Sequence, residues 1–502
     1  MSSIIKSMKN RYKLVILLLL MILCGCSKKT ENKVYQNIQE LDGKNMGCMS
    51  GSIFDVLINE KFPNSEIVYF GSRSELLLGL SSGKIDGFIS DEPVAMMMVK
   101  QNQSVKYLDE AVGEVHYGVC FSPDSKDKLV QFNQYLTNIE SNGHLKELQD
   151  KWINVNGTEQ KKQEYELDGK NGVLRCVTTP DAAPFSFISD NVFQGYEVEL
   201  LSEFCYEYGY ALDISTVNFD ALLTSIAMNK YDIGFNGIFI TPEREKSVSF
   251  CTPTFTGRDV VMVRSGDIVS EDKDLITKIT DSIYRNFIEE DRYKLLINGA
   301  LVTLTISVFS VIGGTLFGLL LYYLSSINPA LKKFIDFVQK LMAKLPAVVI
   351  LMLLFYVVFN NSSIHASIVS IIGFGFLFGN TFYGLIKAGD ASVDYGQKEA
   401  AVALGYGRWL SFFHIILPQI LKIIKESYLR EIISLIKNTS IVGYVSVNDV
   451  TRSSDIIRGR TYDALFPLIV TAFIYYLLCT LLVALIRIPL EHYINMKVNY
   501  HD

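Results

Sequence analysis

The chain has 502 residues, of which 49% are hydrophobic and 20% are charged, and its formal net charge is −6. This length exceeds one ordinary domain, so several domains are expected. A negative net charge with scattered Lys and Arg argues against a nucleic-acid partner. Charged residues are concentrated between Lys28 and Arg292, whereas the part from Gly299 to Ile488 is largely apolar.

The N-terminus combines positive charge with a short apolar run. Lys and Arg residues occur between Lys6 and Lys13, and the apolar segment 14–23 follows. This run is too short for a comfortable membrane span, so residues 1–26 are predicted to form a secretory signal. The sequence Leu23-Cys24-Gly25-Cys26 resembles a bacterial lipoprotein box, which would make Cys26 a lipidated N-terminus. A plain signal peptide and an uncleaved anchor remain open as alternatives.

Cysteine and histidine are scattered along the chain. Neither the eight cysteines nor the six histidines show the spacing of a metal site, and no metal or other cofactor is expected. Five cysteines fall in the exported part, and an odd number cannot all pair within one chain. Buried free thiols are therefore expected.

Two segments of the soluble part, 27–155 and 156–266, alternate short apolar strands with helical stretches. This alternation predicts two α/β lobes with helix-covered sheets. The expected strands are 46–49, 87–90, 174–179 and 232–238, and the expected helices are 75–84 and 221–230.

The two segments also share local sequence. "LDGKN" begins at Leu41 and again at Leu167, each time before an apolar run. The sequences of the two predicted helices align with a constant offset, and each is followed by Lys-x-Asp, beginning at Lys84 and at Lys230. Any amphipathic helix that feeds a strand has some of these features, but the shared exit favours a related pair of lobes.

The lobes resemble the polar amino-acid-binding proteins of ABC importers. "GIFITPEREKSVSF" (237–250) is similar to the Thr-x-x-Arg segment of that family's first lobe, and "GKIDGFISDEP" (83–93) is similar to its second lobe. The resemblance implies a two-lobed periplasmic-binding-protein-like fold. Further matches are "GCMSGS" (47–52), "APFSF" (183–187), "GYEVEL" (195–200) and the closing helices of 127–152.

The order of the two lobes is reversed relative to that family, and this reversal predicts a circular permutation. Segment 27–155 holds the second lobe and the returning C-terminal helices, and 156–266 holds a linker and the first lobe. The family's C-terminus, at Trp152, is then joined to its N-terminus near Leu167, and the break follows 259–263. Permutation is physically reasonable because domain termini often lie close together. Two independent half-domains are the alternative.

A free amino acid needs a fixed cation for its carboxylate and a fixed anion for its ammonium. Arg244 offers a two-pronged donor that suits a carboxylate, and the resemblance assigns it that role. The resemblance also assigns the ammonium to Asp91, while a surface arginine and a turn aspartate are the plainer readings. Further candidates are Gly51 and Ser52 before a helix start, Gly237 with backbone acceptors, and Phe219, which packs on the ligand or belongs to the core.

Two positions depart from the family pattern. Phe239 stands where a small hydroxyl residue is common, and Ala182 where an aromatic residue is frequent. One carboxylate donor is therefore missing and the pocket at Phe239 has a changed shape. Side-chain specificity cannot be carried over, and lobes that only brace the membrane part are a further alternative.

The part after the lobes is predicted to lie on and in a membrane. Residues 267–297 have apolar residues at helical spacing with mixed charge, as in an amphipathic connector. Five apolar segments then have about the 20-residue length that a bilayer requires. They give an outside start and an inside tail at 491–502. The segments lie near 299–324, 337–359, 364–387, 412–443 and 463–486, and Pro418 and several charges interrupt the fourth.

Loop charges support this orientation only in part. Lys332, Lys387 and Arg408 fall on the predicted inner side, but Arg452, Arg458 and Arg460 fall outside. The signal and the exported lobes decide the orientation.

The segment "EAAVALGYGRWLSFFHIILPQ" (399–419) resembles the EAA loop of ABC importer permeases. Small residues allow a short helix to seat closely in a partner's groove, and Gly405 allows the chain to turn. The resemblance implies that this groove belongs to an ATPase subunit; the plainer reading is an amphipathic interfacial helix. The matching residues are Glu399, Ala400, Ala401, Gly405, Leu417 and Pro418.

Residues 298–490 as a whole resemble an ABC permease domain. "KNTSIVGYVSVNDVTR" (437–452) adds to the match, whereas "MAKLPAVV" (342–349) departs from the family's Arg-Gly-Thr-Pro segment. No GxxxxGK[ST] occurs in the sequence, so a separate ATPase subunit is expected. Permeases of this type work in pairs, which implies a homodimer or another paired permease.

These observations predict a receptor fused to its own permease, in the cytoplasmic membrane of a bacterium with the lobes outside. The chain would import a small polar amino acid and would make and break no bond itself. A ligand-gated channel or sensor is the rival, since two-lobed domains also sit on such proteins, but the EAA-like loop argues against it.

Overall fold

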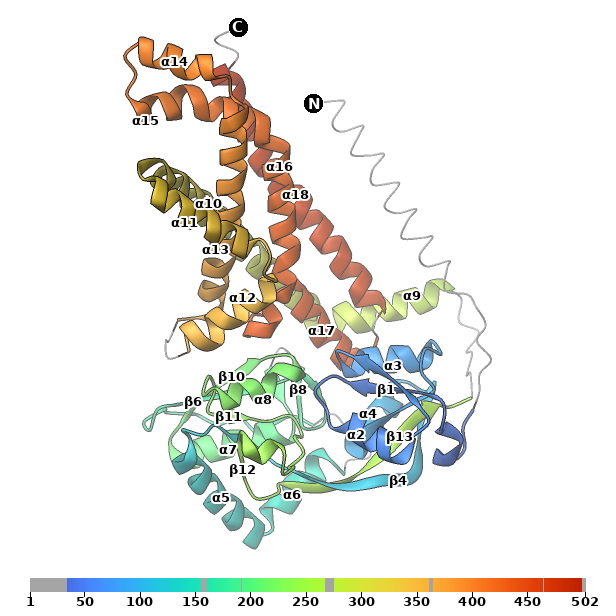
Figure 1. Cartoon of the computed structure of the whole chain (residues 1–502). Helices are drawn as coiled ribbons and strands as arrows, with labels where there is room; N and C mark the ends of the chain where they lie inside the picture. The colour runs from blue at the N-terminus through green and yellow to red at the C-terminus, as the bar shows by residue number, and fades with distance from the viewer. Residues whose placement is uncertain are drawn as a thin grey trace.

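The computed structural model describes residues 34–154, 160–190, 192–266, 275–360, 364–463 and 465–498. The predicted signal 1–26 and Cys26 lie outside the described residues. An α/β region forms one end of the molecule, and a bundle of long helices extends from it (Figure 1).

One lobe, called lobe A here, comprises residues 34–117 and 255–266 and is built on a five-stranded sheet. Its strand order is β2-β1-β3-β13-β4, with β13 antiparallel to both neighbours. Helix α3 begins after Ser72, whose hydroxyl accepts the Glu75 N–H, while the Glu75 carboxylate accepts the Gly71 N–H. The elements are β1 Asn45–Met49, α2 Phe54–Lys61, β2 Glu66–Phe70, α3 Arg73–Ser81, β3 Gly87–Asp91, α4 Glu92–Gln101, β4 Val105–Tyr117 and β13 Phe255–Arg264.

The other lobe, lobe B, comprises 118–154 and the described part of 160–254. Its main sheet has the order β10-β6-β11-β5-β12. The strand expected over 232–238 is only β11, Ile233–Gly234, because the backbone turns at Gly237, where φ is +62°. The main elements are β5 Cys120–Phe121, α5 Lys126–Ser141, α6 His144–Trp152, β6 Val173–Thr178, β7 Asp181–Ala182, β8 Ser186–Ser189, β9 Val192–Gln194, α7 Tyr196–Tyr208, β10 Ala211–Thr216, α8 Phe219–Ala227 and β12 Ser249–Phe250.

Two antiparallel strands connect the lobes. β4 leads from lobe A to β5 of lobe B, and β13 runs back and pairs with β3 and β4. Helix α6 packs beside α7 in lobe B, and the Trp152 indole N–H donates to Glu199. β13 thus belongs to the sheet of lobe A, although the predicted boundary placed it with the second segment. Val34 lies directly against Gly266, so the two ends of the described α/β region meet.

The prediction of buried free thiols is confirmed. The five cysteines of the lobes, Cys48, Cys120, Cys176, Cys205 and Cys251, are all free and buried.

The helical region differs from five straight spans. Within the described residues, three helices are long and apolar enough to cross a membrane: α10 Tyr293–Ile327, α13 Ala366–Ser392 and α18, which begins at Leu465. The segment predicted over 337–359 is a broken pair, α11 Pro329–Met342 and Ala347–Val358, bent by 108° next to Pro346. Helix α16, Leu417–Asn438, packs against α13 and α18 but is not one of the apolar spans, because Lys and Glu residues interrupt it.

Glycines bring the two central helices together. A Cβ atom on Gly314 or Gly318 of α10 would lie within 3 Å of the carbonyl oxygen of Gly375 or Gly379 of α13. Small residues allow this close approach, which is how packing stabilises helix pairs where the surrounding lipid is itself apolar.

Candidate functional site

The predicted ligand residues come together between the two lobes. Six of them, two from lobe A and four from lobe B, line one cavity of about 20 Å³. Gly51 is not among the lining residues, but a Cβ atom at this position would lie 3.0 Å from the α-carbon of Asp220 in lobe B. The cavity, called the ligand cleft here, is lined by Met49, Ser52, Ile53, Phe54, Arg73, Asp91, Phe219, Gly237, Phe239 and Arg244.

Asp91 is the anion of the cleft. It is the last residue of β3, is 4% exposed, and accepts a 3.1 Å hydrogen bond from the Tyr117 hydroxyl. Burial raises the pKa of the Asp91 carboxyl, and the Arg73 guanidinium and the Tyr117 hydroxyl oppose this effect. Removal from water makes this carboxylate a strong partner for a positive group.

Arg244 is the predicted cation on the lobe B side. Its Nη1 donates to the Phe239 carbonyl oxygen at 3.0 Å, and its backbone N–H donates to the Thr241 hydroxyl at 3.3 Å. The Thr-x-x-Arg spacing therefore caps the short turn that carries the arginine. Burial lowers the pKa of the Arg244 guanidinium, and the Asp91 charge opposes this effect.

Arg73 is a residue of the cleft that the sequence did not indicate. It begins α3, is 7% exposed, and lies between two carboxylates, 3.9 Å from Asp91 and 3.7 Å from Asp181 of lobe B. Its Nη1 has no hydrogen-bond acceptor among the described residues. Arg73 thus links the lobes at the position where a ligand ammonium would meet Asp91.

Aromatic rings fill the rest of the cleft. Phe239 lies 5.4 Å from Phe54 and 5.1 Å from Tyr117, measured between ring centroids, and both contacts are edge-to-face. The remaining 20 Å³ is far below the roughly 300 Å³ of a small ligand pocket. The structure therefore shows the lobes closed on their own side chains.

Two more carboxyl groups are buried near the cleft. Glu197 accepts the Gly237 N–H at 2.8 Å, which fixes the turn at Gly237, and burial raises the Glu197 pKa to about 8. Asp259 pairs with Asp91 across β13 and β3, is fully buried, and has no hydrogen-bond partner on either oxygen in the described structure. Burial, followed by the Asp91 charge, raises the Asp259 pKa to about 8.

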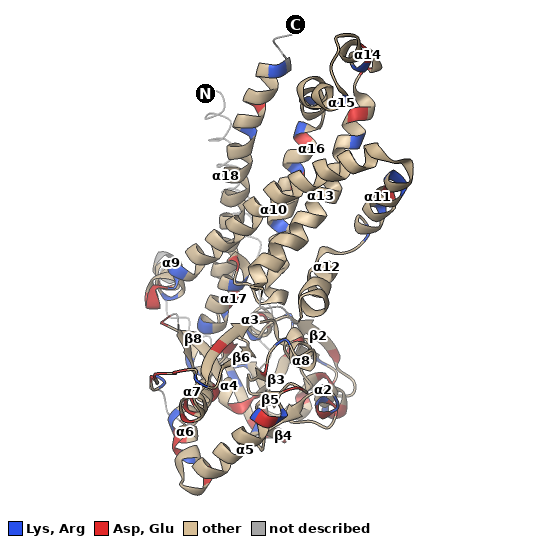
Figure 2. Cartoon of the chain, turned by 90° about the vertical axis from the view of Figure 1, so that its left-hand side faces the viewer, with Lys and Arg blue, Asp and Glu red and all other residues tan. Residues whose placement is uncertain are grey.

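Helix α17, Val450–Thr461, joins the helical region to both lobes (Figure 2). Arg452 donates to the Asn218 side chain of lobe B at 2.9 Å and to a neighbouring backbone carbonyl. Arg458 donates to Glu75 of lobe A at 3.1 Å. Gly459 allows close contact with Asp181, since a Cβ atom there would lie 2.4 Å from the Asp181 Cβ.

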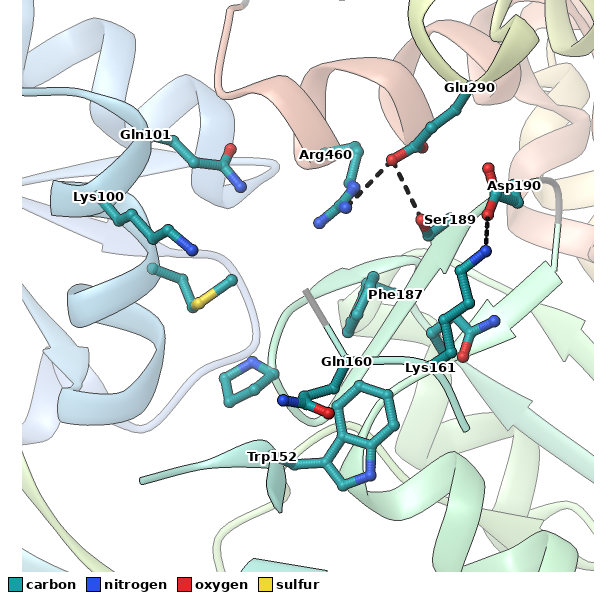
Figure 3. Close-up of a pocket in the computed structure, with 13 residues that line it drawn as sticks. Lys100, Gln101, Trp152, Gln160, Lys161, Phe187, Ser189, Asp190, Glu290 and Arg460 are labelled. Atoms are coloured by element: carbon teal, nitrogen blue, oxygen red, sulfur yellow. Dashed lines mark hydrogen bonds and ion pairs between the residues drawn. The ribbon is translucent and has the colours of Figure 1, made fainter. Parts of the chain in front are cut away.

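A third arginine of this helix completes the contact (Figure 3). Arg460 donates to Glu290 at 3.2 Å, and the Ser189 hydroxyl of lobe B donates to the same carboxylate at 3.1 Å. The Arg460 guanidinium also lies over the Phe187 ring, 5.0 Å from its centroid. The arginines that opposed the loop-charge rule are therefore buried against the lobes.

The EAA-like segment lies at the opposite end of the helical region (Figure 1). It forms α14, Tyr395–Ala403, and the chain turns at Gly405 with φ of +82°. Glu399 and Ala400 are exposed, Ala401 is buried, and Leu417 and Pro418 begin α16. Apolar side chains are displayed here: Tyr395, Val402 and Leu404 are 71%, 70% and 75% exposed.

Comparison with known proteins finds a family match in each region of the chain. Residues 174–304 match the bacterial extracellular solute-binding proteins, family 3, and residues 294–489 match the binding-protein-dependent transport system inner membrane component.

Individual relatives match the two regions separately. A Rickettsia felis protein described as a glutamine transport system permease, GlnP, is 33% identical over 192 residues, covering 37% of this chain and 87% of that protein. The Bacillus subtilis arginine transport system permease ArtQ is 32% identical over 198 residues, covering 37% and 87%. The arginine-binding extracellular protein ArtP of the same organism is 27% identical over 119 residues, covering 24% and 46%.

Proposed function

We propose that this chain, which belongs to the binding-protein-dependent transport system inner membrane components, binds a small polar amino acid between its own lobes and passes it to its own membrane helices. The chain is a multi-pass inner-membrane transport subunit in which a solute-binding domain and a permease domain of an amino-acid ABC importer are fused. This membership replaces the alternative of a ligand-gated channel or sensor.

One observation carries the proposed ligand site. The carboxylate Asp91 of lobe A and the guanidinium of Arg244 of lobe B line the same cleft. A zwitterionic amino acid supplies one charge for each, so it bridges the lobes and favours their closure. Glutamine and arginine are named for the relatives, and both carry this pair of charges.

The strand order supports a circular permutation as the origin of the receptor. Both sheets share one arrangement: three parallel strands, β2-β1-β3 in lobe A and β10-β6-β11 in lobe B, are followed by an antiparallel strand that arrives from the other lobe, β13 next to β3 and β5 next to β11. Val34 lies against Gly266, so the two ends of the described α/β region are close together, as the proposal requires. The match of a solute-binding family to 174–304 is in keeping with a first lobe that comes second.

An ATPase subunit is the partner proposed for the EAA-like segment. Exposed apolar residues of α14, with Glu399 beside them, form a surface at the end away from the lobes. In the family, ATP binding and hydrolysis by such a subunit drive the permease, and two permease domains pair. We infer the same for this chain, with a homodimer as the simplest assembly.

A second candidate role for the lobes is bracing alone. Its support is the small cleft, about 20 Å³, and the Arg73 guanidinium, which lies between Asp91 and Asp181 and links the lobes itself. In that role the lobes would hold α17 in place and the amino acid would enter the helices directly.

Thermal unfolding of the full chain in lipid nanodiscs, with single amino acids added, separates the two roles. A receptor is stabilised by one class of amino acid, and Arg244→Ala abolishes the shift. Lys246→Ala, in the same turn and exposed, is the control and keeps the shift. A well-folded wild-type chain that no amino acid stabilises would support bracing, and an unchanged shift in Arg244→Ala would refute the carboxylate assignment.

A further inference from the structure

A second cavity separates the ligand cleft from the helical region. Its volume is about 260 Å³, and lobe A, lobe B and α17 all contribute to its wall. Met49 and Phe219 line both this cavity and the cleft, so the two share a wall. The cavity, called the interface chamber here, is defined by Glu75, Asp181, Asn218, Ser440, Arg452 and Asp455.

The two cavities differ in capacity in the same structure. Water occupies about 30 Å³ in the liquid, so the chamber of about 260 Å³ has the space of roughly nine waters. A free amino acid has about that many heavy atoms or slightly more. The cleft, at about 20 Å³, has space for about one water. An amino acid displaced as the cleft closes therefore has room in the adjoining chamber.

Arg452 supplies a positive group at the chamber wall. The residue is 6% exposed, and its two Nη groups donate to Asn218 and to the Val217 carbonyl oxygen. Its Nε has no hydrogen-bond partner within the described structure. A buried guanidinium N–H without an acceptor is unfavourable, and a ligand carboxylate is the acceptor that fits it best.

Carboxylates supply the opposite charge. Asp455, Glu75 and Asp181 line the chamber with Arg452. Arg458 pairs with one oxygen of Asp455 and one of Glu75, and Arg73 pairs with Asp181. The other oxygens of these carboxylates remain available to pair with a ligand ammonium. Counted with Asp449, the lining has four carboxylates and one arginine, so a second negative charge on a ligand is disfavoured there.

We propose that the interface chamber is a second amino-acid site, which the substrate occupies after leaving the cleft and before entering the membrane helices. The ligand carboxylate pairs with Arg452, and its ammonium pairs with Asp455 and the neighbouring acids. Neutral and cationic amino acids fit this charge pattern, and acidic ones do not. The inference rests on the proposed function of the lobes as an amino-acid receptor.

Equilibrium binding to the full chain in nanodiscs tests this site, with tritiated L-glutamine, L-arginine and L-glutamate as probes. Arg244→Ala disables the cleft. We expect residual binding of L-glutamine or L-arginine but not of L-glutamate. Adding Arg452→Gln should weaken that residual binding by at least about tenfold. Arg460→Gln on the Arg244→Ala background is the matched control, because Arg460 is a buried arginine of the same helix outside the chamber.

Each outcome decides the matter. No residual binding in Arg244→Ala, or equal residual binding with and without Arg452→Gln, would overturn the second site. Wild-type affinity in Arg244→Ala would instead overturn the cleft assignment, and the effect of Arg452→Gln alone would then decide on the chamber. Should Arg452→Gln fail to fold, Ser440→Trp fills the chamber and should remove the same residual binding; unchanged binding in that variant would also overturn the proposal.

Discussion

The two ends of the helical region differ in which side chains they bury and which they leave exposed. At one end, α17 buries Arg452, Arg458 and Arg460 against the lobes, each with an acceptor in another segment. At the other end, Val402 of α14 and Leu404, which follows the helix, are about three-quarters exposed.

The difference in burial between α17 and α14 distinguishes contacts within the chain from a surface that is left uncovered. Exposed apolar residues gathered on one short helix mark a surface for another protein, whereas the α17 contact is already complete. Fusion keeps the receptor at a high effective concentration at its own permease. The ATPase remains a separate partner in the proposal.

The largest effect is expected from a substitution in the exposed surface of α14. Glu399→Lys reverses a charge on α14 and should lower ATP-driven uptake by at least about tenfold, since a like charge in a docking surface is strongly unfavourable. Amino-acid binding should not change. Glu60→Lys, an equally exposed reversal on lobe A, is the control. Full coupled uptake in Glu399→Lys would remove the docking role of α14.

A smaller effect is expected from removing a buried ion pair between α17 and lobe A. Arg458→Ala removes the partner of Glu75 and Asp455 and should destabilise the contact between lobe A and α17 by about 1–3 kcal/mol. Faster hydrogen exchange in α3 would report it. Arg487→Ala removes a half-exposed ion pair with Glu426 and should change stability by less than about 1 kcal/mol. Equal effects of the two variants would show that α17 is not a tight contact.

A larger residue at Gly459 tests how closely α17 packs against lobe B. Gly459→Val places a side chain against Asp181. This overpacking should destabilise the contact between lobe B and α17 by about 1–3 kcal/mol and move the two apart. Gly313→Val in α10 is the control, because a Cβ atom there meets nothing within 4 Å. Cross-linking of cysteines placed in β7 and α17 measures the separation. A yield in Gly459→Val as high as in the control would contradict this packing.

The smallest effect is a dependence on pH confined to the lobes. The Asp259 pKa is raised by burial to about 8, whereas an unfolded aspartate has a pKa of about 4. Between these values the folded state holds a proton that the unfolded state has released, so stability falls as pH rises from about 4 to 8. Asp259→Asn should flatten this dependence in thermal unfolding of the full chain. An unchanged slope would mean that Asp259 is ionised in the fold.

The sequence predicted features that depend on local spacing. Thr241 caps the turn that carries Arg244, and Gly405 ends α14 with a positive φ, so a short motif contains the information for each. Arg73 was missed because its role depends on Asp91 and Asp181, which come from two different lobes. No local pattern marks such a meeting point.

Membrane segments show the same limit. Hydrophobicity identified α10, α13 and α18, but it joined the two arms on either side of Pro346 into one span. It also extended the fourth segment from 412 to 443, where the structure has a π-helical turn, Phe412–Ile416, leading into α16, and a 3₁₀ helix, Thr439–Val445, after it. The direction of the chain at these breaks is set by packing against neighbouring helices, which composition does not record.

The most direct test of the central claim is uptake by the full chain, reconstituted in proteoliposomes with its ATPase subunit and no added binding protein. We predict ATP-dependent accumulation of labelled L-glutamine or L-arginine, lost in Arg244→Ala. Uptake that requires a separate binding protein, or that is unaffected by Arg244→Ala, would contradict the account of a receptor fused to its own permease.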